Sequence, residues 1–356
     1  MSAKWGFLVY MAGNNSLSAA ADQDLAEMRK VGSTKDVAVL VFVAQARQSG
    51  TAHRFKVEKA GKGEKVETLK QVDSGDPQTV IDFIRWGMKQ APAERYAVVL
   101  WNHGGGWSPL DLDQLYSQVR GIQGDVISRR EMNHRAAQPI ARTFFSTSVK
   151  EILSRPTEKE RAILSDDGTG HSLDTIELGR VLKLARKEVG RKIDLLGMDA
   201  CLMSTLEVAY EVRDDVGVVV GSEEPEPGAG WDYSTLLSDL TANPAMDAAE
   251  LGRKAVARYT ESYQKLTAQW PVTQCAIDAS RIDGLCQAVD ALEGALRPRL
   301  KEEWSKVLTV QKNSVMLNTS FRLVDLASLC QNLTTAPLGE EIQNAANAVL
   351  EALRPG

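Results

Sequence analysis

A histidine and a cysteine stand out in this chain because each follows directly on an apolar run. His103 comes after the run 97–101 and is followed by three glycines, and Cys201 comes after the mostly apolar run 193–200. A thiol becomes a nucleophile once it loses its proton, and an imidazole can accept that proton near neutral pH. The two residue types would make a nucleophile–base pair if the fold brings them together.

Short apolar runs alternate with helix-like segments over the first two-thirds of the chain. The strand-like runs are 5–11, 37–44, 96–101, 193–197 and 216–221. The helix-like segments between them are 17–31, 79–90, 173–189 and 202–214. Alternation of this kind predicts an α/β fold with a mostly parallel sheet and helices on both of its faces. Ligands bind at the carboxyl ends of such strands, so we expect His103 and Cys201 at the same edge of the sheet.

The surroundings of these two residues fit chemistry on a carbonyl group. The predicted helix 202–214 would put Cys201 at a helix N-terminus, whose positive end favours the thiolate. The glycines after His103 allow close backbone approach and offer N–H groups to a developing oxyanion. Asp199 shares a strand face with Cys201, and its carboxylate could pair with a substrate cation. The alternative is that Asp199 only caps the helix.

The rest of the chain predicts a hairpin, an insertion and a second subdomain. The stretches 53–58 and 66–72 are typical of a β-hairpin. Residues 108–161 are polar and rich in Arg and Lys without a clear period, which is typical of a functional or disordered insertion. After residue 231 the chain is mainly helical, with one strand-like run at 272–278. We therefore expect a first domain over 1–240 and a smaller, mainly helical subdomain over 241–356, packed on the sheet.

Composition excludes several classes of protein. The net charge of −5 over 356 residues argues against a nucleic-acid partner. The first apolar run is too short for a signal peptide or a membrane span, so we expect a cytoplasmic protein without a membrane partner. The four cysteines lie far apart without a Cys-x-x-Cys pair, which argues against a zinc site and a disulfide framework. The oxygen-rich stretch 166–174 does not fit an EF-hand and predicts a turn; no metal site is predicted.

Two further readings compete with a nucleophile–base pair. His-Gly-Gly-Gly also forms the oxyanion loop of α/β-hydrolase esterases, but the chain lacks the Gly-x-Ser-x-Gly elbow that those enzymes need. A catalytically silent scaffold that binds a partner is the second alternative. Such a scaffold has no need of His103 or Cys201, so their presence disfavours it.

Four ordered blocks of sequence resemble the clostripain family of cysteine peptidases. They are Trp-Asn-His-Gly-Gly-Gly-Trp at 101–107, Leu-Leu-Gly-Met-Asp-Ala-Cys-Leu-Met at 195–203, and the segments 9–15 and 222–233. The resemblance implies a caspase-like fold, a His–Cys dyad and cleavage of protein or peptide substrates after a basic residue, Arg or Lys. It also implies activation by internal cleavage. Some family members need calcium, so calcium is the one cofactor that the resemblance leaves open.

The resemblance also assigns roles to residues. It implies that His103 is the base, that Cys201 is the nucleophile, and that Gly104 and Cys201 supply the oxyanion N–H groups. Asp199 would form the floor of the pocket for the basic side chain. The acidic loop 223–232 would lie beside the cleft and contribute Glu223, Glu224, Trp231 and Asp232 to substrate binding. Trp231 would either form a pocket wall or anchor this loop to the core. The segment 108–161 would be cut on activation, by the enzyme itself or by an upstream protease.

Overall fold

The chain divides into two compact units, Met1–Ala279 and Ser280–Gly356. The computed structural model describes residues 2–48, 50–59, 64, 66–104, 162–164, 166, 169, 173–264, 272–318 and 323–354. The sequence-based boundary after residue 240 falls inside a helix, α8 (Tyr233–Ala242). The observed division comes later because strand β10 (Cys275–Asp278) completes the sheet of the first unit.

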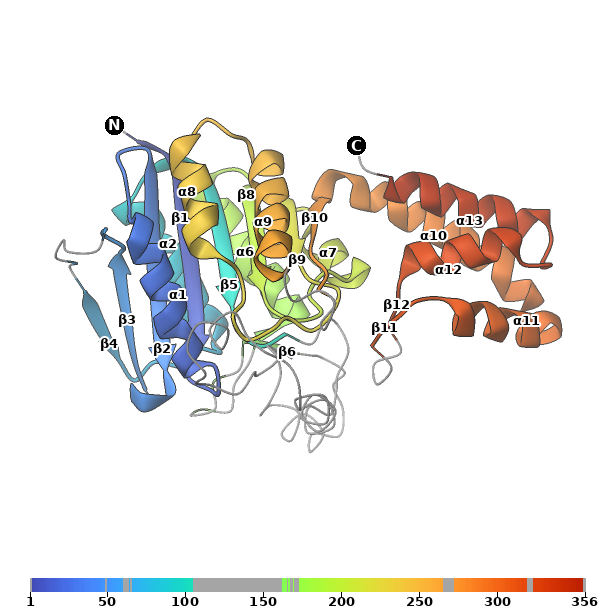
Figure 1. The fold of residues 1–356 in the computed structure, drawn as a ribbon, viewed down its shortest axis with the longest axis horizontal. Helices are drawn as coiled ribbons and strands as arrows, with labels where there is room; N and C mark the ends of the chain where they lie inside the picture. Colours follow the sequence, from blue (N-terminus) through green and yellow to red (C-terminus); the bar gives the residue numbers. More distant parts are fainter. Residues whose placement is uncertain are drawn as a thin grey trace. The chain divides into compact units, whose positions relative to one another are not determined.

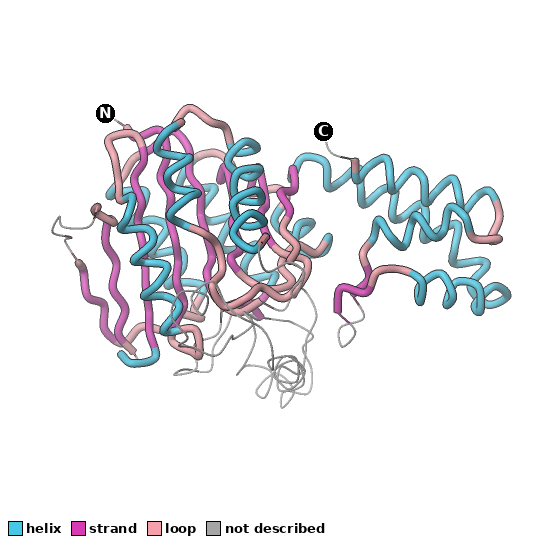
Figure 2. The backbone as a smooth tube through the Cα atoms, viewed as in Figure 1, coloured by secondary structure: helices cyan, strands magenta, loops and turns pink. Residues whose placement is uncertain are grey.

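An eight-stranded sheet forms the centre of the first unit in the described residues (Figures 1 and 2). In spatial order its strands are β10 (Cys275–Asp278), β9 (Val216–Gly221), β8 (Ile193–Asp199), β5 (Ala93–Trp101), β1 (Ala3–Gly13), β2 (Val37–Gln45), β3 (Thr51–Lys56) and β4 (Glu67–Lys70). The five strands from β9 to β2 run parallel, and the outer three pair antiparallel. The predicted α/β fold is confirmed, with a mostly parallel sheet and a hairpin at one edge.

The central strands are apolar along their whole length because both faces of the sheet are covered. In β1, Trp5, Phe7 and Val9 belong to one buried cluster, whereas Tyr10 on the other face stacks on Phe42 of β2 at 4.4 Å between ring centroids. Successive side chains of a strand point to opposite faces, so a strand between two helix layers needs apolar residues at nearly every position.

Two layers of helices cover the sheet (Figure 1). One layer holds α1 (Ser18–Val31), α8 and α9 (Ala248–Tyr263), and the other holds α2 (Pro77–Gln90), α6 (Thr175–Val189) and α7 (Leu206–Val212). The short strands β6 (Ala162–Ile163) and β7 (Leu173–Asp174) pair with each other ahead of α6. None of the helices in the described part of the chain is long and apolar enough to cross a membrane.

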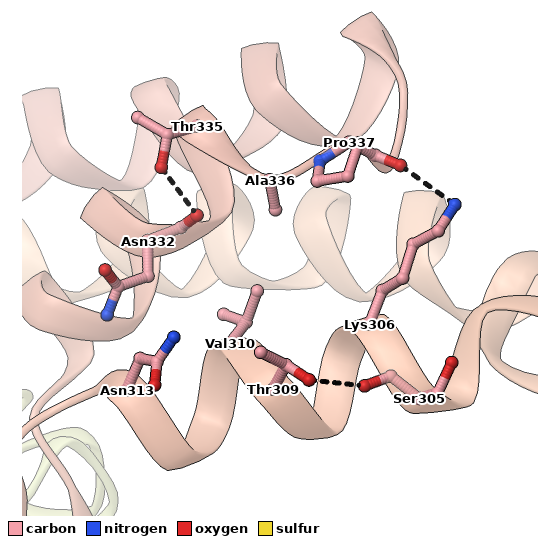
Figure 3. A pocket seen from close by; sticks show the side chains of 9 residues that line it. All are labelled: Ser305, Lys306, Thr309, Val310, Asn313, Asn332, Thr335, Ala336 and Pro337. Carbon is pink, nitrogen blue, oxygen red and sulfur yellow. Dashed lines mark hydrogen bonds between the residues drawn. The ribbon is translucent and has the colours of Figure 1, made fainter.

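The second unit is mainly helical, as the sequence predicts. Its helices are α10 (Ile282–Leu296), α11 (Leu300–Asn313), α12 (Leu326–Thr335) and α13 (Glu340–Leu353), with a hairpin of β11 (Met316–Asn318) and β12 (Leu323–Val324). A groove of about 380 Å³ lies between α11 and α12 (Figure 3). Lys306, its cationic residue, pairs with Glu303 at 2.6 Å and donates to the carbonyl of Pro337. The groove contains none of the predicted site residues.

Candidate active site

The residues expected to do chemistry follow two neighbouring strands. Strands β5 and β8 are paired in parallel, with Trp101 opposite Asp199 at their carboxyl ends. The backbone N–H of Asn102 donates to the carbonyl of Asp199 at 3.4 Å, which continues the pairing by one residue. His103 and Cys201 each come two residues after this last register pair. The fold therefore brings the two predicted residues to one edge of the sheet, where ligands bind in open parallel sheets.

His103 is buried, with 1% of its surface exposed. Its Nε2 atom lies 2.8 Å from the hydroxyl of Ser16, and its backbone N–H donates to Oδ1 of Asn102 at 2.5 Å. Gly104, the predicted oxyanion donor beside it, is also buried. The imidazole therefore contacts a loop residue that lies 87 positions earlier in the chain.

Two asparagines fix the backbone on either side of this histidine contact. Asn102 donates from Nδ2 to the carbonyl of Ala12 at 2.7 Å, and its Oδ1 also accepts from Asn15 Nδ2 at 2.9 Å. Asn15 in turn accepts the N–H of Leu17 at 2.9 Å. The roles of both asparagines were not predicted from the sequence. Both lie within the sequence blocks 9–15 and 101–107, and Asn102 follows directly after strand β5.

A buried aspartate secures the neighbouring position. Asp166 is fully buried, and its Oδ1 accepts from Asn14 Nδ2 at 2.5 Å. Its Oδ2 accepts from the backbone N–H and the hydroxyl of Ser74 at 3.0 and 2.8 Å. The sequence predicted only a turn at this point. Asp166 instead joins the loop after β1 to the loop before α2.

Cys201 lies in a turn, and the expectation of a helix N-terminus at this residue is wrong. Helix α7 begins at Leu206 after the N-cap Thr205, so four residues separate Cys201 from the helix. Leu202 has a φ of 62°, a left-handed conformation that a helix cannot contain. The backbone therefore turns away after β8 before the helix starts.

A backbone N–H faces the sulfur in place of a helix end. The N–H of Glu226 donates to Cys201 Sγ at 3.1 Å, and the carbonyl of the same residue lies 3.9 Å from the sulfur. The thiol itself is fully buried. The N–H bond favours the thiolate, as the helix was expected to do, whereas full burial and the S–H bond to the Glu226 carbonyl favour the thiol.

The acidic loop after β9 is tied to the turn that contains the cysteine. The hydroxyl of Thr273 accepts the N–H groups of Glu223 and Glu224 at 3.1 and 3.0 Å. The carbonyl of Glu224 accepts the N–H of Leu202 at 3.3 Å. Both glutamate side chains are half-buried, and burial raises the pKa of Glu224. The predicted loop therefore lies next to Cys201.

Asp199 is fully buried beneath the same loop. Its Oδ2 accepts from the hydroxyl of Tyr233 at 2.8 Å and from the N–H of Trp231 at 3.5 Å. Trp231 is buried in the core cluster, and its ring lies so close to Gly197 that a side chain at this position would clash with it. Asp232 caps α8 through a bond from the N–H of Thr235 at 3.1 Å.

Several sequence-based expectations lie outside the described residues. These are the insertion 108–161 and the glycines that follow Gly104. Within the ranges that the structure describes, no three His, Cys, Asp or Glu side chains gather so that they could hold a metal ion.

The sheet order and the paired strand ends fit a caspase-like cysteine peptidase. The model of the clostripain family matches residues 9–133 and 152–352, and the chain belongs to this family. Clostripain from Hathewaya histolytica is 25% identical over 181 residues, which are 48% of this chain. The match spans only 26% of that protein.

Solved structures support the fold assignment. A secreted C11 cysteine protease from Bacteroides thetaiotaomicron, bound to an irreversible peptide inhibitor, matches with a TM-score of 0.63 and 19% identity. The match covers 98% of this chain and 82% of that one. An inactive zymogen of a C11 protease from Parabacteroides distasonis gives a TM-score of 0.62 and 18% identity, over 99% and 82% of the two chains. At these identities the likeness shows a shared fold.

Proposed function

We propose that this chain is an endopeptidase that cleaves after Arg or Lys, with Cys201 as nucleophile and His103 as general base. The observation that carries the proposal is the register of β5 and β8, in which Trp101 lies opposite Asp199. Because His103 and Cys201 each follow two residues later, base and nucleophile come from adjacent strand ends. Membership of a cysteine peptidase family supports the same pairing.

The chemistry starts with proton transfer from the Cys201 thiol to the His103 imidazole. The thiolate then adds to the substrate carbonyl carbon, and the N–H groups of Gly104 and Cys201 receive the negative charge on its oxygen. As the C–N bond breaks, the imidazolium gives its proton to the leaving amine, and a thioester remains. Water, deprotonated by His103, hydrolyses this thioester and restores the thiol.

The preference for a basic residue rests on Asp199. Its carboxylate is fully buried two residues before the nucleophile, and two hydrogen-bond donors fix the position of Oδ2. A buried carboxylate is a strong partner for a guanidinium or ammonium group, and a neutral side chain in the same pocket would leave the charge uncompensated. This supports Arg or Lys before the scissile bond.

The burial of the pair supports a precursor form. His103 and Cys201 are 1% and 0% exposed, so a peptide carbonyl cannot contact Sγ in this conformation. We infer that the conformation is that of a zymogen. A cut within 108–161, by the enzyme itself or by an upstream protease, would then open the site.

Cleavage-site profiling with a peptide library tests this proposal. Wild type and Cys201→Ala are compared with Cys275→Ala, a control that removes a thiol from an edge strand. We expect wild type and Cys275→Ala to cut after Arg and Lys, and Cys201→Ala and His103→Ala to be inactive. A rate for Cys201→Ala within about tenfold of wild type would refute the assignment. A folded protein that cuts nothing in any form would favour the silent scaffold.

A further inference from the structure

The serine that contacts the imidazole lies on a different element from the dyad. Ser16 belongs to the loop between β1 and α1 and is exposed, yet its hydroxyl lies 2.8 Å from Nε2 of the buried His103. This contact is a side-chain hydrogen bond of normal length, so it can select one state of the imidazole.

The loop that presents Ser16 is fixed on both sides. Before it, Asn14 is held by the buried Asp166, and Asn15 donates to Ala12 and to Asn102. After it, the N–H of Leu17 returns to Asn15 Oδ1 at 2.9 Å. Because Asn102 also accepts the N–H of His103, one set of hydrogen bonds positions both partners of the contact. The Ser16 hydroxyl is thereby held in place before any substrate binds.

A neutral imidazole carries its proton on one nitrogen and a lone pair on the other. We propose that Ser16 is a positioning residue for His103: its hydroxyl accepts the Nε2 proton and so keeps the lone pair on Nδ1. This inference rests on the proposed function, in which His103 takes the thiol proton. Nδ1 then exchanges that proton with Cys201, and Ser16 acts through the imidazole.

The same contact also serves the charged state. Once the proton has moved, both ring nitrogens donate, and Ser16 keeps accepting from Nε2. A hydrogen bond from a charged donor is stronger than one from a neutral donor, so the thiolate–imidazolium pair gains more than the neutral pair. A hydroxyl adds no negative charge, and in this respect it differs from the aspartate of serine-protease triads.

The test uses Ser16→Ala, Ser16→Thr and Ser18→Ala in the full chain. Thr retains the hydroxyl at an exposed position, and Ser18, two residues on at the start of α1, is a serine control outside the contact. Kinetics on an Arg peptide give kcat and KM separately. Nitrogen-15 spectra of histidine-labelled protein report which ring nitrogen is protonated, and His103→Ala assigns the signal among the four histidines of the chain.

We expect Ser16→Ala to lower kcat by about ten- to a hundredfold with little change in KM, as loss of a hydrogen bond to a charged group predicts. Its His103 spectrum should lose the single Nε2–H form, and Ser16→Thr should restore both readouts. A Ser16→Ala enzyme with wild-type kcat or an unchanged His103 tautomer would overturn the inference. Failure of the proposed function is a separate result, because Cys201→Ala would then remain active.

Discussion

Two loop residues prepare the proposed dyad at the scale of single side chains. Glu226 donates a backbone N–H to Cys201 Sγ at 3.1 Å, and Ser16 contacts His103 Nε2 at 2.8 Å. Neither contact depends on the charge of a third side chain. The Glu226 N–H is a fixed dipole that could stabilise the proposed thiolate without reorganisation when the proton moves.

Asp199, the proposed specificity residue, gives a prediction at the same scale. Asp199→Asn should lower kcat/KM for Arg substrates. The corresponding rise in activation free energy should be about 3–5 kcal/mol, because the substrate cation would be buried without its partner. Asp247→Asn is the matched control, since asparagine caps a helix as well as aspartate does and Asp247 caps α9. Rates on matched Arg and Ala peptides give the measurement.

A preserved Arg preference in Asp199→Asn would contradict this role. The half-buried Glu223 and Glu224 would then be the next candidates, because they lie on the loop tied to the turn after Cys201.

The sequence predicts some of these residues and not others for a physical reason. His103, Cys201 and Asp199 lie at the ends of apolar runs, so the strand pattern alone brings them to one edge. Ser16 and Asp166 act through partners 87 and 152 positions away. A local pattern contains no information about such contacts, and a serine or an aspartate in a loop is ordinary.

At the scale of elements, apolar strands could be predicted and the short helix could not. The strand β9 is observed over the predicted residues 216–221, because a strand covered on both faces must be apolar throughout. Helix α7 is seven residues long and starts four positions later than predicted. The apolar residues before it, such as Leu202 and Met203, are buried in the turn, and they imitate the periodicity of a helix.

An ion pair between α8 and α9 gives a prediction about stability. Arg258 binds Asp239 through Nε at 2.7 Å and Nη2 at 3.1 Å, and this hydrogen bonding lowers the pKa of Asp239. A carboxyl whose pKa is lowered in the folded state stabilises that state fully at pH values above its unfolded-state pKa, near 3.8. This stabilisation is lost as the pH falls through the lower pKa of the folded state. Asp239→Asn should lower the free energy of unfolding by about 0.5–1 kcal/mol at neutral pH, since both groups are partly exposed.

Urea unfolding between neutral pH and the acid limit of the folded protein checks this prediction. The deficit of Asp239→Asn should shrink as the pH falls below 3.8. Glu261→Gln is the control, because Glu261 contacts the same Arg258 from an exposed position. A deficit of equal size at every pH would show that the ion pair is not its cause.

The whole molecule gives a prediction about activation. The insertion 108–161 separates β5 from β8, which are neighbours in the sheet over five register pairs from Ala97–Leu195 to Trp101–Asp199. Its basic residues are Arg120, Arg129, Arg130, Arg135, Arg142, Lys150, Arg155, Lys159 and Arg161. With the proposed acidic pocket, the peptidase would be tethered to its own preferred cleavage sites, at an effective concentration of about millimolar for a short link.

We therefore expect purified wild type to be cut after one or more of these residues, and the two pieces to stay together. Strand pairing and the buried core join them, so only denaturant should separate them on gel filtration. Intact mass and N-terminal sequencing of wild type and Cys201→Ala locate the cut. Cleavage of both forms would show that an upstream protease makes the cut. Full activity of an uncut chain would show that the intact chain is not a zymogen.

The nucleophile itself is tested most directly by covalent labelling. An irreversible peptidyl ketone ending in Arg is added to the cleaved enzyme at about pH 7.5, and peptide mass mapping locates the adduct. Burial raises the pKa of the Cys275 and Cys330 thiols to about 11, so both should stay protonated and unreactive. We predict one adduct per chain, on Cys201, formed in step with the loss of activity. Loss of activity with the adduct on any other residue would contradict the assignment of Cys201 as the nucleophile.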